Sequence, residues 1–136
     1  MSDAGLALKL LQLNASAPFN RWAGFEIVSA EPGRVELRME WKDDAAQYQG
    51  FLHAGLVGAL IDTACGFAAF TQAGPVLASH FQVNCLAPAV GVVFHCKGEV
   101  LKAGKRQIFT RAELHAESKD GIRKLVATGE TILMTT

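Results

Sequence analysis

The middle of the chain, from residue 45 to residue 96, spans 52 residues and contains a single charged side chain, Asp62. At the chain average of 19% charged residues, a stretch of that length would hold about ten. Charged side chains stay in water while apolar ones are buried, so this stretch must supply most of the core.

The segment GLVGALIDTACGFAAF, residues 55–70, is apolar on nearly every side and shows no alternation. This pattern predicts a long helix buried at the centre of a domain. The segment is long enough to be considered as a membrane span, but it contains Asp62 and its apolarity comes mostly from glycine and alanine. We therefore expect a core helix and no membrane partner.

The rest of the chain predicts one short helix and six strands. The helix is expected at about 4–13, and the strands at 25–30, 35–41, 76–86, 91–101, 106–117 and 123–134. Only one long helix interrupts the strands, so the sheet should be largely antiparallel. The prediction is a single α+β domain over residues 1–136, with a sheet wrapped around the helix.

Composition excludes several classes of protein. The chain has 13 basic and 13 acidic residues, which argues against a protein that binds nucleic acid. Its three cysteines, Cys65, Cys85 and Cys96, form no CxxC pair and follow no export signal. They predict reduced thiols, all in the core, in a cytoplasmic protein without a metal site.

Asp62 has only small residues one helical turn away and no lysine or arginine within 17 residues on either side. Burial without a cation raises the pKa of a carboxyl group toward the range of a general base at neutral pH. The competing interpretation is a structural aspartate that accepts hydrogen bonds from backbone amides.

The start of the same helix offers a second chemical group. His53, Ala54 and Gly55 lie where free N–H groups and the helix dipole favour negative charge, so an N–H there can polarise a carbonyl. His53 is expected to cap or brace this turn. A carboxylate base and an oxyanion donor together suggest attack on an acyl carbon. No GxSxG, GxGxxG or P-loop motif is present.

Three segments carry a family resemblance: GFLHAGLVGALIDTACGFAAF (50–70), VNCLAPA (83–89) and VLKAGKR (100–106). They resemble the hotdog-fold acyl-CoA thioesterases of the phenylacetic-acid-degradation type, over about residues 45–134. The resemblance implies a curved antiparallel sheet wrapped around a long helix, which agrees with the α+β class predicted from patterning.

The resemblance also implies roles for single residues. In the family, the residue that matches Asp62 is the carboxylate that acts as general base or nucleophile, and the residue that matches Ala54 has the N–H that polarises the thioester carbonyl. The residue that matches Gln47 contacts the thioester or the attacking water, and the residue that matches His53 is the histidine that supports the turn. Substrate contacts are expected from Gly55, Gly66, Ser79, Phe81 and Arg106. The resemblance implies a homodimer with shared active sites that often pairs into a tetramer, and coenzyme A only as part of the substrate.

The chain departs from the family pattern at three places. Ala54 replaces the first glycine of an H-G-G motif; alanine keeps the backbone N–H, and the chemistry is preserved if φ is negative at this position. Gly66 and Ala78 occupy positions where relatives carry a hydroxyl that orients water, with Ser79 as the neighbouring substitute. His80 and Gln82 stand where relatives often carry a charge.

Arg106 lies on a predicted hairpin and has two interpretations: a solvated residue or a contact for a phosphate of coenzyme A.

The residues and the family resemblance together predict hydrolysis of an aryl- or medium-chain acyl-CoA, and they leave the exact acyl group open. Two alternatives remain. One is an acyl-thioester hydratase or dehydratase that uses His53 and Asp62, and the other is a non-catalytic sensor that binds acyl-CoA.

Overall fold

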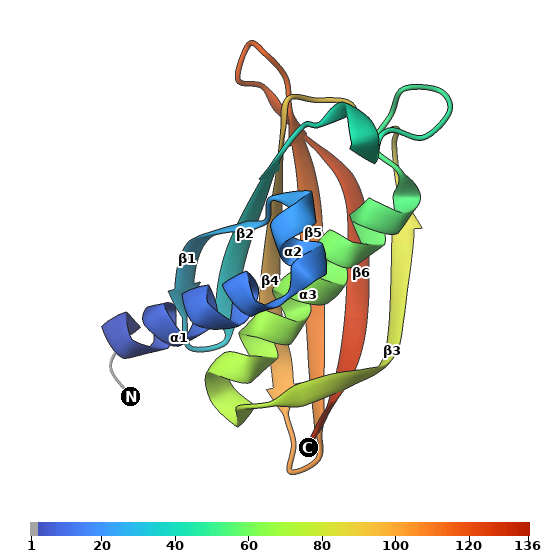
Figure 1. Cartoon of the computed structure of the whole chain (residues 1–136). Coiled ribbons are helices and arrows are strands. Elements are labelled where there is room, and N and C mark those ends of the chain that lie inside the picture. The colour runs from blue at the N-terminus through green and yellow to red at the C-terminus, as the bar shows by residue number, and fades with distance from the viewer. Residues whose placement is uncertain (1–2) are drawn as a thin grey trace.

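The structure is a computed structural model that describes residues 3–136 and shows six strands curved around one long helix, α3 (Figure 1). The helices are α1 (Asp3–Ser16), α2 (Pro18–Ala23) and α3 (Ala54–Ala73), with a 3-10 helix η1 (Asp43–Ala45). The strands are β1 (Glu26–Glu31), β2 (Arg34–Glu40), β3 (Val76–Cys85), β4 (Val93–Ala103), β5 (Gln107–Glu117) and β6 (Arg123–Thr135).

The strand order is β1-β2-β4-β5-β6-β3, and every neighbouring pair is antiparallel. The α+β class and the sheet wrapped around a central helix are confirmed. The predicted long helix and strands have bounds within three residues of those observed. Helices α2 and η1 were not predicted from the sequence. Pro18 at the start of α2 and Gly24 in a left-handed conformation after it are helix start and stop signals, so α2 was detectable.

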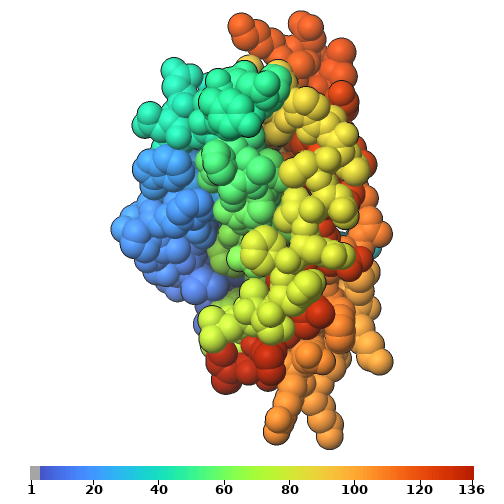
Figure 2. Space-filling view, turned by 90° about the vertical axis from the view of Figure 1, so that its right-hand side faces the viewer, coloured from blue at the N-terminus to red at the C-terminus, as the bar shows by residue number. Residues whose placement is uncertain are grey.

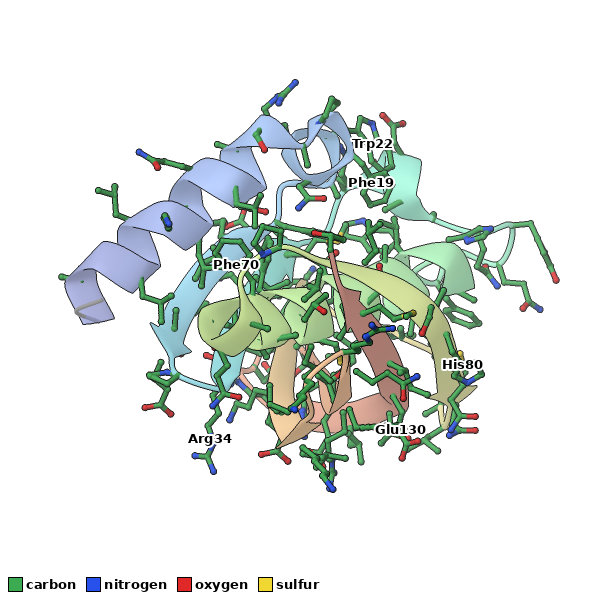
Figure 3. All side chains as sticks on the ribbon, turned by 90° about the horizontal axis from the view of Figure 1, so that it is seen from below. Phe19, Trp22, Arg34, Phe70, His80 and Glu130 are labelled. Carbon is green, nitrogen blue, oxygen red and sulfur yellow. The ribbon has the colours of Figure 1, made fainter. Side chains whose placement is uncertain are left out.

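The two faces of the sheet differ in chemistry. In β2 buried and more exposed residues alternate, which is the period of two expected for a sheet with one dry face. Val35, Leu37 and Met39 face the core. Charged side chains cover the opposite face, where Arg34 and Glu130 point away from α3 in Figure 3. Helix α3, from the apolar middle of the chain, fills the concave side of the sheet.

Two glycines let α3 lie directly on the sheet. A Cβ at Gly98 of β4 would stand 2.5 Å from the carbonyl oxygen of Ala64, and one at Gly129 of β6 would stand 2.6 Å from Ile61 Cγ2. Contacts this short do not occur with real side chains, so the absence of Cβ atoms sets the height of the helix above the sheet.

The N-terminal helices lie on the side of α3 away from the sheet (Figure 3), and α1 contacts β1 and α2. The Asn20 side chain donates a hydrogen bond to Asn14 Oδ1 at 3.0 Å, and the Asn14 amide donates to the carbonyl oxygen of Phe25 at 2.8 Å. These bonds connect α1, α2 and the residue that precedes β1. In the space-filling view, a strip of α3 remains visible between these helices and β3 (Figure 2).

Strand β3 is an edge strand, and most of its side chains are exposed. Leu77 is 68% exposed and Phe81 is 50% exposed. The expectation that Cys85 belongs to the core is wrong, because this residue lies at the end of the exposed edge strand. Cys65 and Cys96 are buried, as predicted.

Candidate active site

His53 is the N-cap of α3. Its Nδ1 accepts a hydrogen bond from the backbone N–H of Gly55 at 2.7 Å, and the backbone N–H of His53 donates to Ala45 O at 2.9 Å. A Cβ at Gly55 would stand 2.8 Å from the same Nδ1, so the glycine leaves room for the imidazole ring. The expected capping role of His53 is confirmed, and the close approach at Gly55 is made by the His53 ring.

Ala54, the first residue of α3, is exposed, and its N–H has no acceptor within residues 3–136. No residue other than glycine has a positive φ in the described chain, so alanine occupies this position without strain. The substitution of alanine for the glycine of the family motif therefore keeps a free N–H. That group lies at the positive end of a 20-residue helix, where it is suited to bind a developing oxyanion.

Gln47 belongs to the loop that leads into α3. Its side-chain Oε1 accepts hydrogen bonds from the backbone N–H groups of Gln49 and Phe51, the latter at 3.3 Å. Gln47, His53 and Ala54 line the same pocket, which has a volume of about 510 Å³. The structure thus brings three of the four predicted catalytic residues together.

Asp62 lies in the third turn of α3 and lines a different pocket, of about 430 Å³. Its carboxylate has no hydrogen bond or ion pair with another described residue, and burial raises its pKa above the ordinary value of an aspartate. The alternative of a structural aspartate bonded to backbone amides finds no such bond in the described chain. An unpaired, partly buried carboxylate with a raised pKa is suited to proton transfer near neutral pH.

The two halves of the predicted site are separated within one chain. Ala54 and Asp62 are eight residues apart on α3, a rise of about 12 Å along the helix axis. A carbonyl oxygen about 3 Å from the Ala54 N–H would leave its carbon too far from Asp62 for one intervening water. One chain alone does not assemble both groups around one thioester.

The other predicted substrate residues take varied positions. Gly66 lines the Asp62 pocket, one turn after the carboxylate. Ser79 does not line it, because its hydroxyl donates to Ile132 O at 3.2 Å across a bulge, and Ala78 lines the pocket instead.

Phe81 packs its ring over Gly58 and remains half exposed. Arg106 lies on the β4–β5 hairpin, at the end of the sheet away from the start of α3 (Figure 1).

The buried thiols are poor candidates for nucleophiles. Burial raises the pKa of the Cys65 thiol, and it raises the pKa of the Cys96 thiol well above the ordinary value. Both thiols therefore stay protonated at neutral pH. Within residues 3–136, no three His, Cys, Asp or Glu side chains are grouped in a way that holds a metal ion.

Sequence reasoning missed one wall of the Asp62 pocket. This wall comes from the end of α1 and from α2, through Leu13, Ser16, Ala17 and Asn20. These residues are distant from Asp62 in the sequence, and no motif marks them. Only the packing of the N-terminal helices against α3 reveals their position.

Comparisons with known proteins identify the family. The family model described as the thioesterase superfamily matches residues 49–122. Human acyl-coenzyme A thioesterase 13 is 31% identical over 106 residues, which cover 76% of this chain and 74% of the human protein. A thioesterase family protein from Silicibacter pomeroyi has a crystal structure with 38% identity and a TM-score of 0.91, covering 95% of this chain and 96% of that one.

A more distant structure supports the same fold. The PaaI protein from the phenylacetic acid degradation operon of E. coli has 19% identity and a TM-score of 0.87, with 99% of this chain and 96% of that chain covered. The matched region includes most of the loop before α3, α3 itself and strands β3 to β5. The chain therefore belongs to the thioesterase superfamily, and its sheet wrapped around one helix is the hotdog fold.

Proposed function

We propose that this protein hydrolyses the thioester of an acyl-CoA to the free acid and coenzyme A. The observation that carries the proposal is Asp62, an unpaired carboxylate with a raised pKa, on the central helix of a thioesterase-superfamily chain. The similarity to human acyl-coenzyme A thioesterase 13 supports an acyl-CoA substrate.

In the proposed reaction, Asp62 removes a proton from a water molecule whose oxygen attacks the carbonyl carbon. The Ala54 N–H donates a hydrogen bond to the carbonyl oxygen and stabilises the negative charge that forms there. The C–S bond then breaks, and coenzyme A leaves as a thiolate that takes up a proton. Because a thiolate is a good leaving group, the reaction has little need of a strong general acid. In the alternative route, the Asp62 carboxylate attacks the carbonyl carbon directly, the C–S bond breaks with loss of the coenzyme A thiolate, and water hydrolyses the resulting anhydride to the free acid and Asp62.

We further propose that two chains form each site, with Asp62 of one chain facing Ala54 of its partner. The separation of the two groups along α3 supports this arrangement, since neither pocket alone contains both. The exposed edge strand β3, with Leu77 and Phe81 uncovered, offers a surface for a second copy. A dimer that pairs further into a tetramer is compatible with this proposal.

The hydratase alternative is less well supported. Hydration of an acyl thioester calls for a histidine and an acid that converge on neighbouring carbons. The His53 Nδ1 accepts a hydrogen bond from the Gly55 N–H at 2.7 Å, so this ring nitrogen is engaged in the helix cap. The structure therefore favours a supporting role for His53 over proton transfer.

Release of free thiol from a panel of saturated and aryl acyl-CoAs tests the proposal. We expect release by the wild type and a loss of at least about 100-fold in Asp62→Asn, which is typical of removing a general base. The matched control is Asp44→Asn, which removes an exposed carboxylate outside both pockets. Tight binding without thiol release would favour the sensor, and addition of water to an enoyl-CoA would favour the hydratase.

A further inference from the structure

The pocket beside Asp62 has a shape and chemistry of its own. On α3 it is lined by Asp62, Thr63, Gly66, Phe67 and Phe70, which form one stripe along the helix. The start of β3 and Leu133 of β6 form one wall, and the α1–α2 junction forms the other. Phe70 lies on the side of α3 that faces the N-terminal helices (Figure 3).

We propose that Gly66 is the position that sets acyl-chain length. The acyl group lies in this pocket as an extended chain that starts at Asp62, crosses Gly66 and ends near Phe70. The inference rests on the proposed function of Asp62, and it adds the occupant of the pocket and the residue that selects it.

The lining of the pocket fits an apolar chain. Apart from Asp62 the described lining residues carry no charge, and Phe67, Phe70, Val76 and Leu133 supply apolar surface. The phosphates of coenzyme A would find no cation there. Burial of each further methylene in such a pocket strengthens binding by about fourfold.

The length of the pocket limits the chain. Asp62 and Phe70 are eight residues apart, a rise of about 12 Å on a helix. An extended chain advances by about 1.2 Å per bond, so the distance accommodates about ten bonds. The structure therefore favours an acyl group of about eight to ten carbons.

Gly66 leaves the path open between the two ends. It lies one turn beyond Asp62, and a Cβ placed on it would have as its nearest neighbour Leu133 Cδ2, at 3.7 Å. A methyl group therefore fits here without a clash, whereas a larger side chain would project into the pocket and obstruct a chain that extends past Asp62. Short acyl groups end before this point and would be unaffected.

The test is a chain-length series of saturated acyl-CoAs from acetyl to lauroyl, assayed with the wild type, Gly66→Ala and Gly66→Val. In the wild type, kcat/KM should rise with length to about eight to ten carbons and then level off. Gly66→Val should lower kcat/KM for octanoyl-CoA by about tenfold or more relative to acetyl-CoA, with Gly66→Ala between them. Gln72→Val is the matched control, because Gln72 is exposed on the same helix outside this pocket.

A second measurement separates binding from chemistry. In the Asp62→Asn background, the Kd of octanoyl-CoA should weaken by about tenfold on adding Gly66→Val, while that of acetyl-CoA stays constant. Equal effects on all chain lengths, or none, in both measurements would overturn the role of Gly66. Failure of the wild type to release thiol would instead overturn the proposed function, and the binding series would still decide what occupies the pocket.

Discussion

Among single residues, Asp62 is held in an environment that disfavours its charge. Its pKa is raised by burial, so the folded protein retains the Asp62 proton at pH values where the unfolded chain has released it. The ionised carboxylate therefore lowers stability as pH rises through the range between the unfolded pKa and the raised folded pKa. Function and stability make opposite demands at this position.

Asp62→Asn should accordingly be at least as stable as the wild type at neutral pH. The difference in free energy of unfolding should shrink as the pH falls from the raised folded pKa to the unfolded pKa of about 4, and it should stay small below that pH. Urea denaturation at several pH values measures it, with Asp44→Asn as the control for the loss of one charge. A variant that is less stable than the wild type at pH 7 would show that Asp62 is a structural residue.

The rate of thiol release should depend on the same ionisation. Because Asp62 acts as a base only when it has lost its proton, kcat/KM should fall on the acidic side of a pKa above the ordinary aspartate value of about 4. A pH–rate profile measures this directly. An acidic limb at or below pH 4 would contradict the assignment of Asp62 as a buried base.

A variant of His53 tests whether this side chain stabilises the start of α3. Removing its hydrogen bond to the Gly55 N–H in His53→Ala should lower the free energy of unfolding by about 1 kcal/mol, as for other N-caps. Loosening the turn that presents Ala54 should also slow thiol release by about tenfold or more. His53→Asn, with a side chain that caps helices well, should recover most of the stability. Equal stability of all three proteins would argue against the cap.

Among the elements, the contact of α3 with the sheet depends on glycine. Gly98→Ala would place a methyl group 2.5 Å from the backbone of α3, which cannot move without shifting the helix. We expect a loss of about 1–3 kcal/mol in the free energy of unfolding. Gly66→Ala on the helix itself is the control, because its nearest contact is 3.7 Å away and alanine favours helix. Thermal unfolding of both variants checks the prediction, and a stable Gly98→Ala protein would contradict it.

The elements that were predictable are those with strong periodic patterns. The alternation in β2 and the long apolar segment of α3, interrupted by Asp62, predicted the correct element types and nearly correct bounds. The burial of a residue was harder to predict where it depends on the order of the strands in the sheet. Cys85 sits on a strand with an apolar pattern, yet that strand is the edge β3, and nothing local in the sequence distinguishes an edge from a centre.

The candidate site was predictable in the same uneven way. Asp62 is recognisable in the sequence because it is the single charge between residues 45 and 96, and His53 and Ala54 because they lie at the predicted helix start. The predicted cap by His53 is confirmed. The wall formed by Leu13 and Asn20 was not predictable, because it depends on how α1 and α2 dock onto α3. Contacts between segments that are distant in the sequence produce no residue spacing from which a motif could be recognised.

At the scale of the whole molecule, the central claim is that Asp62 and the Ala54 N–H act on one thioester across two chains. Ala54→Pro is a clean way to remove that N–H, since proline is favoured at the first position of a helix. The preceding His53 already has the extended backbone, at φ −59° and ψ 136°, that proline requires of its neighbour. The variant should therefore fold while losing most of its thiol release.

Mixing two inactive chains then provides the most direct measurement. When Asp62→Asn and Ala54→Pro chains are co-expressed with different tags, each mixed dimer contains one site with an intact Asp62 and an intact Ala54 N–H. Random pairing of equal amounts should restore about a quarter of the wild-type thiol release, from half of the dimers with one working site each. Mixed dimers that form, remain folded and release no thiol would contradict the account.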